Sequence, residues 1–284
     1  MRTLDIGKIG LGMVVLTAFS QAALAGRGGS TGAIISAVNS GSSDAIVAEI
    51  ERAEELACLS CIAPVQKLVD YPDARVRDAA GWWLGRRGVR DEVIASMTSR
   101  LSLQDPQAAR NAADVLGGMR DFSTLAALSA YMKHPLDEES GIAAARAIGA
   151  IGHPTGLAAL QAGFGSTLPG VRAASLQAVR NLRAPIGSKT VTSAGGILPL
   201  LADADAGVRL QAALTCGFLQ DKTATSALAG VATGDASPLV RKAAAWAIGE
   251  IGDASGAAAL TQAQNDADPL VRSVATGALG RLTH

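Results

Sequence analysis

The chain has 284 residues with 25 basic and 25 acidic side chains, and 49% of its residues are hydrophobic but only 3% aromatic. This balance argues against nucleic acid as a partner, because such a partner requires a clustered basic surface. The apolar residues are mostly small, which favours closely packed helices over a sheet.

Residues 1–25 have the pattern of a secretory signal peptide. Arg2 and Lys8 form a basic start, residues 9–19 form an apolar run, and Ala23-Leu24-Ala25 is a small-residue cleavage motif. We therefore expect cleavage after Ala25 and a periplasmic or secreted mature chain; an uncleaved N-terminal anchor is the alternative. Later apolar runs are too short to span a bilayer, so no membrane span is expected.

Residues 26–42 begin with the sequence GRGGSTG and are predicted to be a flexible mature N-terminus. Residues 43–63 then predict a capping helix, with Ser43 as its N-cap and with its end at Leu56.

Two cysteines, Cys58 and Cys61, follow the capping helix. In an exported protein the first interpretation is a short disulfide that ties the capping helix to the next element. A reduced pair, a metal site and redox exchange are the alternatives. The helical context does not favour a thioredoxin-like motif, and a structural zinc site needs four ligands. The third cysteine, Cys216, is predicted to be a small buried hydrophobe.

From residue 64 to residue 284 the sequence repeats. Seven segments align on a Val-Arg dipeptide, with the arginine column at positions 77, 110, 141, 172, 209, 241 and 272, which are 31 to 37 residues apart; Gly141 breaks this column in the third repeat. A period in this range indicates a solenoid of stacked units. Each segment has an apolar stripe at helical spacing. Shorter apolar stretches predict first helices at 123–133, 155–164, 196–201, 224–231 and 256–263.

Two antiparallel helices in each repeat are the unit of an α-solenoid. The predicted fold is therefore an all-α superhelix of about seven helix pairs.

Three columns of the repeat have a physical explanation. An aspartate before four of the segments is a predicted N-cap (Asp73, Asp137, Asp205 and Asp268). The arginine column is expected to form a ladder with loop aspartates or carbonyls of adjacent repeats, with an anion-binding row as the alternative. A glycine column, at 85, 118, 149, 217, 249 and 280, indicates that neighbouring backbones approach closely, and Arg180 is its exception.

The segments SPLVRKAAAWAIGEIGD, DPLVRSVATGALGRL and ESGIAAARAIGAIGHPTGLAALQ carry a family resemblance. They resemble the HEAT-repeat superfamily, in particular the phycobilisome-lyase-type HEAT-like repeats of bacteria. The resemblance implies that the second helices line the concave surface. The superfamily includes scaffolds, adaptors, lyases and metal-dependent hydroxylases. The hydroxylases carry His-Glu pairs, and this sequence contains no His-Glu dipeptide. The lyases act on intracellular antenna proteins, which does not fit an exported chain.

One face of the second helices differs in every repeat, so stacking does not require it and a partner can use it. We expect it to carry aromatic and arginine anchors for a protein partner, with gap-filling between helices as the alternative. The candidate residues are Trp82, Arg86, Met119, Arg146, Gln177, Leu214, Phe218, Trp246 and Glu250. The neighbouring Trp83 falls in a core column.

An insertion between two repeats and the last helix of the chain carry further expectations. The insertion at residues 184–196 is expected to be a linker, or alternatively a functional loop. In the last helix, Val274, Leu279 and Leu282 have no following polar helix to cover them. End-to-end self-association through this face is therefore an alternative.

The sequence thus predicts a protein-binding scaffold or assembly factor that is not an enzyme and has no cofactor. The alternatives are an accessory subunit of an enzyme or redox system that uses Cys58 and Cys61, and a small-ligand carrier.

Overall fold

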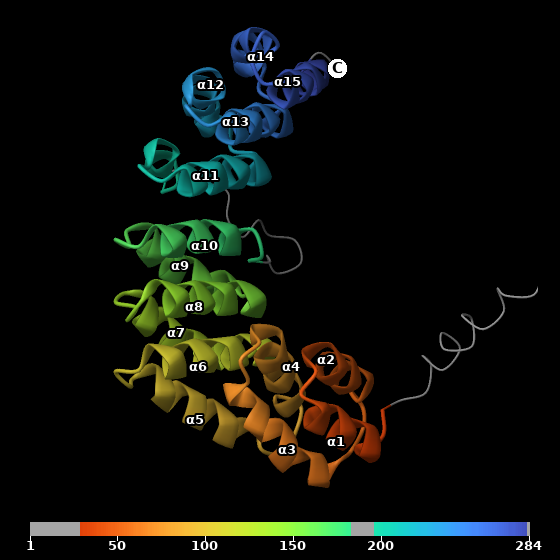
Figure 1. Ribbon diagram of the computed structural model, residues 1–284. Helices are drawn as coiled ribbons and strands as arrows, with labels where there is room; N and C mark the ends of the chain where they lie inside the picture. The colour runs from red at the N-terminus through yellow and green to blue at the C-terminus, as the bar shows by residue number, and fades with distance from the viewer. Residues whose placement is uncertain (1–28, 183–195, 283–284) are drawn as a thin grey trace, which may run out of the picture.

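The computed structural model describes residues 29–182 and 196–282 as a stack of helices (Figure 1). The predicted signal peptide, its cleavage point after Ala25 and all but the last residue of the 184–196 insertion lie outside these described residues. Within the described part, no helix combines the length and the apolar character that a membrane crossing requires.

The N-terminal hairpin consists of α1 (Thr31–Ser40) and α2 (Ser43–Arg52). The prediction of a flexible segment at 26–42 is therefore wrong for α1. This helix forms because the Ser30 side chain accepts a hydrogen bond from the Ala33 N–H, and because Ile34 and Ala37 are buried. Gly41 joins the two helices with a φ of 67°, in the left-handed region that favours glycine.

The helix α2 differs from its prediction at both ends. Its N-cap is Ser42, whose side chain accepts a hydrogen bond from the Ala45 N–H, rather than Ser43. It ends at Arg52 rather than Leu56, because Ala53 leaves helical geometry and its carbonyl accepts a hydrogen bond from Trp83 Nε1. A short 3₁₀ turn, η2 (Leu59–Cys61), then leads into the first helix pair.

Seven long second helices stack in chain order, as Figure 1 shows from α4 to α15. Their bounds are α4 (Ala74–Leu84), α6 (Pro106–Met119), α8 (Glu138–Ile151), α10 (Pro169–Val179), α11 (Ala206–Leu219), α13 (Pro238–Ile251) and α15 (Pro269–Leu282). The predicted aspartate caps are confirmed at four of them, where Asp73, Asp137, Asp205 and Asp268 accept hydrogen bonds from first-turn N–H groups.

A shorter first element precedes each second helix. These elements are α3 (Ile62–Gln66) with η3 (Lys67–Asp70), α5 (Arg90–Leu101), α7 (Leu125–Met132), α9 (Leu157–Phe164), η6 (Leu198–Ala202), α12 (Thr225–Gly234) and α14 (Ala257–Ala263). The 3₁₀ turns η4 (Phe122–Thr124), η5 (Pro154–Gly156), η7 (Lys222–Ala224) and η8 (Ala254–Gly256) introduce α7, α9, α12 and α14. The all-α solenoid of seven pairs is confirmed, although η6 is a 3₁₀ run where an α-helix was expected.

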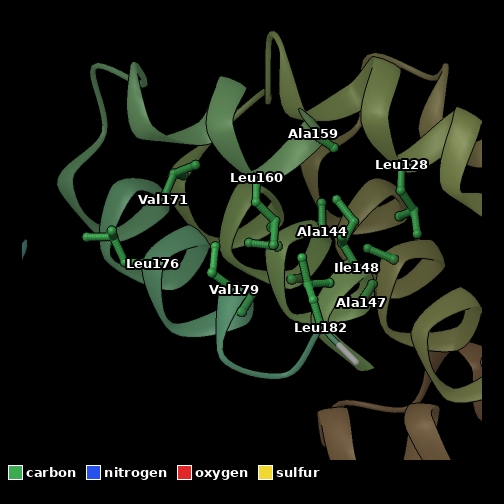
Figure 2. Close-up of a cluster of buried hydrophobic side chains, with 14 of the residues drawn as sticks. Leu128, Ala144, Ala147, Ile148, Ala159, Leu160, Val171, Leu176, Val179 and Leu182 are labelled. Atoms are coloured by element: carbon green, nitrogen blue, oxygen red, sulfur yellow. The ribbon is translucent and has the colours of Figure 1, made fainter. Parts of the chain in front are cut away.

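The core lies between the first and second helices. Figure 2 shows Leu128, Ile148, Leu160 and Leu176 spread along this core, and none of them is exposed to solvent. Trp83 is likewise buried, as its column predicted.

Successive second helices touch backbone to backbone at the glycine column. A Cβ atom added to Gly118 lies 2.1 Å from the Asp78 carbonyl oxygen of α4, and one added to Gly217 lies 2.8 Å from the Ala247 Cα of α13. Backbone cannot move aside as a side chain does, so these positions exclude every larger residue. The predicted close approach of neighbouring helices is confirmed.

The last helix shows less apolar surface than the sequence indicated. Val274, Leu279 and Leu282 are half-buried and pack against the core. Ser273 and Thr276 are exposed on the same helix. Leu270, at the start of this helix, is 58% exposed, so end-to-end self-association stays a prediction.

The glycine column gives a direct test of this packing. Gly118→Ala should lower the free energy of unfolding by about 2 kcal/mol, because the added methyl overlaps a backbone carbonyl. The matched control is Gly277→Ala in α15, where an added Cβ meets nothing within 4 Å. There alanine should stabilise by up to about 1 kcal/mol through its higher helix propensity. Urea unfolding of both variants measures the difference, and equal effects would contradict the packing argument.

Candidate functional site

An arginine–aspartate ladder joins the later repeats. Arg172 donates two hydrogen bonds to Asp203 at 2.8 and 2.7 Å, and it also donates to the Ser166 carbonyl of its own repeat. Arg209 with Asp235 and Arg241 with Asp266 repeat this arrangement. Hydrogen bonds from the arginine lower the pKa of each of these aspartates. The predicted ladder is confirmed, and the guanidinium groups of its arginines are engaged in hydrogen bonds within the chain.

The first repeat uses its ladder arginine differently. Arg77 donates from Nε and Nη2 to Asp114 Oδ2 at 3.0 and 2.6 Å, and both residues are buried. Asp114 lies in the middle of α6, not in a loop. Its second oxygen, Oδ1, accepts a hydrogen bond from Arg146 Nη2 of α8 at 3.0 Å. A buried carboxylate thus couples three successive second helices at one point.

Beside this network lies a groove of about 690 Å³ that is lined by α2, α4, α6 and α8. Its lining includes small residues, which leave room for an occupant: Ala74, Ala79, Gly117, Ala147 and Ala150. The lining also includes charged residues: Glu51, Glu54, Arg75, Asp78, Asp114, Arg120 and Arg146. The volume is in the range of small-ligand and peptide pockets.

Asp78 is the unusual residue of the groove. It is half-buried on α4, and its carboxylate makes no hydrogen bond or ion pair within the described ranges of the chain. Burial raises the pKa of Asp78; Arg120 and Arg146 act in the opposite direction, whereas Asp114 and Glu51 raise the pKa further. A partly desolvated carboxylate without a donor is unfavourable for folding, so its presence indicates a role other than stability.

Trp82 lies one helical turn after Asp78 and also lines the groove. The Arg86 guanidinium stacks on its ring at 4.3 Å from the centroid, and Arg86 also lies 3.7 Å from a Glu54 oxygen. The structure therefore brings Trp82, Arg86 and Arg146, all predicted from sequence, to one region. Asp78, Asp114, Glu51 and Arg120 were not among the predicted site residues.

The other predicted residues are elsewhere. Met119 is only 7% exposed and lies against Gly85 of the preceding helix, so it does not belong to an accessible surface. Gln177 is exposed on α10.

A second cluster of predicted residues lies further along the stack. Leu214 and Phe218 of α11, the latter 54% exposed, and Trp246 and Glu250 of α13 form what we call the C-terminal cluster. The Trp246 ring covers Gly217, and Glu250 lies 3.5 Å from Arg281. Trp246 thus fills a gap between helices, as the packing alternative proposed, while Phe218 does not.

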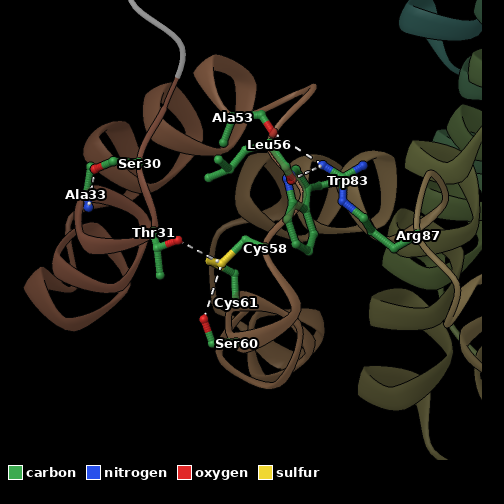
Figure 3. Close-up of a disulfide and its surroundings, with 10 residues drawn as sticks. All are labelled: Ser30, Thr31, Ala33, Ala53, Leu56, Cys58, Ser60, Cys61, Trp83 and Arg87. Carbon is green, nitrogen blue, oxygen red and sulfur yellow. Dashed lines mark hydrogen bonds between the residues drawn. A yellow bond between two sulfur atoms is a disulfide. The ribbon is translucent and has the colours of Figure 1, made fainter.

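The cysteine pair lies between the N-terminal hairpin and the first repeat. Figure 3 shows Cys58 bonded to Cys61, with Thr31 Oγ1 of α1 at 3.3 Å from Cys58 Sγ. The exposed fractions of the two cysteines are 5% and 0%. Nearby, Arg87 donates hydrogen bonds to the carbonyls of Ala53, Glu54 and Leu56. The pair therefore lies in a region that attaches the hairpin to α4.

Cys216 and His153 have structural roles. Cys216 is buried, which raises the pKa of its thiol to about 12. His153 replaces an aspartate at a turn, where its ring nitrogen Nδ1 accepts a hydrogen bond from the Thr155 N–H. Residues 29–182 and 196–282 contain no cluster of histidine, cysteine or acidic side chains that could hold a metal ion.

Comparison with known proteins identifies the family. A family model of HEAT repeats matches residues 94–180 and 196–280, more than half of the chain. The chain belongs to the HEAT-repeat family. No curated protein sequence matches it significantly.

Solved structures include similar chains, one of them with a TM-score above 0.5. The Escherichia coli protein YibA is 15% identical over 90% of this chain and 93% of its own, with a TM-score of 0.55. Human deoxyhypusine hydroxylase in complex with glycerol is 21% identical over 89% of this chain and 96% of its own, with a TM-score of 0.40. The complex of CpcE and CpcF of phycocyanin lyase from Nostoc is 19% identical over 80% of this chain and 97% of the matched chain, with a TM-score of 0.42. At these identities the likeness concerns the fold alone.

The ladder predicts how stability depends on pH. Asp203, Asp235 and Asp266 have folded pKa values below their ordinary value near 3.9, so their contribution is complete above that pH and is lost as pH falls through the lowered values. Arg209→Gln should cost about 2 kcal/mol at pH 7 and flatten this acid dependence. Unfolding measured between pH 7 and pH 3 tests both effects. Lys133→Gln, an exposed change after α7, is the control; an identical acid profile in both variants would contradict the role of the ladder.

Proposed function

We propose that this protein is an exported, non-enzymatic scaffold or adaptor that holds a partner protein on its second helices. The observation that carries the proposal is the groove between α2 and α8, where the half-buried Asp78 has no donor from the described chain and Trp82 is accessible beside it. Aromatic and charged anchors in a concave site are the features that protein interfaces use most.

The shape of the fold supports the same conclusion. A HEAT-type stack presents its variable residues on successive second helices, so one partner can contact several repeats. The groove supplies a charged site, and the C-terminal cluster supplies an exposed aromatic residue, Phe218. We assign the groove the main role and the C-terminal cluster an auxiliary one.

An accessory role in a redox system is the second candidate, and the buried cysteine pair disfavours it. Thiol–disulfide exchange requires that an attacking thiolate reach a sulfur atom. Cys58 and Cys61 are almost fully covered by the hairpin and the first repeat. We therefore propose that the pair is a structural disulfide.

The scaffold proposal is tested by crosslinking and affinity capture from the exported fraction. Trp82→Ala should reduce recovery of the dominant partner at least tenfold, whereas Phe218→Ala should reduce it less. Leu103→Ala removes an exposed apolar side chain on the turn after α5, away from the groove, and is the matched control. Unchanged recovery of the partner with Trp82→Ala, in a variant that retains its helical circular dichroism, would contradict the proposal.

Export and disulfide formation are tested together by intact mass spectrometry of the secreted or periplasmic protein. We expect a chain that begins at Gly26 and is lighter by two hydrogen atoms than the fully reduced form, because Cys58 and Cys61 are joined. Reduction should restore those hydrogens only after unfolding, since both sulfurs are buried. Recovery of the full-length chain from the cytoplasm, with free thiols, would contradict both statements.

A further inference from the structure

The groove has two sides of opposite charge. On the α2 and α4 side, Glu51 and Asp78 have no hydrogen-bond or ion-pair partner within the part of the chain that the structure describes. On the α6 and α8 side, Arg120 likewise has no side-chain partner there, and Arg146 uses one nitrogen on Asp114. The remaining donors and acceptors of these residues are available to an occupant.

The other charges of the groove are already paired. Glu54 lies beside Arg86, Arg75 is bound by Asp44 and Asp73, and Asp114 receives Arg77 and Arg146. Apart from these pairs, the groove has one acidic side that can bind a cation and one basic side that can bind a carboxylate. Small apolar residues also line it. A uniformly basic or uniformly acidic ligand satisfies only one side.

We propose that the groove binds an extended peptide segment of the partner that carries a basic, an apolar and an acidic side chain in succession. The basic group pairs with Asp78 and Glu51, the apolar side chain covers Ala79 and Ala147 beside Trp82, and the acidic group pairs with Arg120 and Arg146. This inference rests on the proposed function and names the chemistry of the partner.

The conformation of Arg120 supports this assignment. Arg120 is the C-cap of α6 and has a φ of 54°, in the left-handed region where residues other than glycine are uncommon. The corresponding cap positions of α8 and α13 hold Gly152 and Gly252, whereas the cap of α11 holds Gln220 with a φ of 55°. A residue other than glycine is therefore tolerated at this cap, and at the end of α6 it places a guanidinium in the lining of the groove.

Asp78 shows a conflict between stability and binding. Its burial without a donor disfavours the charged form. Replacing it by asparagine removes that charge and keeps the shape. A structural carboxylate would lose stability on this change, whereas a ligand-binding one loses affinity and keeps or gains stability.

The test uses the full chain and three labelled decapeptides in a fluorescence anisotropy titration at 0.15 M salt. Each peptide has a central leucine; the first has lysine before it and glutamate after it, the second replaces glutamate by glutamine, and the third replaces lysine by glutamine. We expect the first peptide to bind about tenfold more tightly than either of the others, which corresponds to one charge-assisted contact.

Two variants test which side of the groove binds the basic group of the peptide and which binds the acidic group. Asp78→Asn should weaken binding of both lysine peptides about tenfold and leave the glutamate-only peptide unchanged, with an equal or higher Tm. Arg120→Gln should weaken binding of both glutamate peptides and leave the lysine-only peptide unchanged. Asp91→Asn, an exposed change on α5, is the control and should alter none of them.

Several results would overturn the inference: equal affinity for all three peptides, no binding of any peptide, or a uniform loss in Asp78→Asn. Concentration-dependent dimerisation that Asp78→Asn abolishes would assign the groove to a second copy of this chain instead. If Asp78→Asn and Arg120→Gln still capture the native partner while Trp82→Ala does not, the scaffold proposal stands and this inference alone fails.

Discussion

The close approach of neighbouring second helices is the constraint on which the rest of the structure depends. At Gly118 and Gly217 one helix lies directly against the backbone of the next, so no side chain separates them. Glycine within a helix costs about 1 kcal/mol relative to alanine. The stack compensates by burying the apolar stripes on both sides of the contact. The same contact fixes how each helix is rotated, and therefore which residues point into the groove.

A single change in the polar pairing distinguishes the two halves of the stack. In the later repeats the ladder arginines bind loop aspartates such as Asp203 and Asp235, and this charge serves folding. In the first repeat Arg77 binds Asp114 in the middle of the next second helix, which brings a carboxylate to the groove and engages Arg146. The N-terminal half consequently has a charged groove.

Most of the fold could be predicted from the sequence because its determinants are local and repeated. The period, the helix pairs, the aspartate caps, the arginine ladder and the close approach at the glycines each depend on spacing within one repeat or between neighbours. The helix α1 was missed because its glycine-rich surroundings hid the Ser30 cap and the short apolar pair Ile34 and Ala37.

The candidate site could be predicted only in part. The predicted variable face contains Trp82, Arg86 and Arg146, which lie at or beside the groove, but the period does not specify the curvature that brings α2 and α8 to one groove. The burial of Met119 depends on how closely α4 packs against the end of α6, which the period does not specify either. One signal was present: Asp114 occupies a column that holds Gly81, Ala145, Leu176, Ala213, Ala245 and Thr276 in the other repeats. A single carboxylate in such a column points to a specialised repeat.

The central claim is that partners bind in the groove lined by α2, α4, α6 and α8. Amide hydrogen exchange of the full chain, with and without its captured partner, tests this claim most directly. We predict that the partner slows exchange at the C-terminal turn of α2, around Asp78 and at the Arg120 turn, and leaves α5 and α12 unchanged. Protection confined to the first helices, or to α11 and α13, would contradict the account.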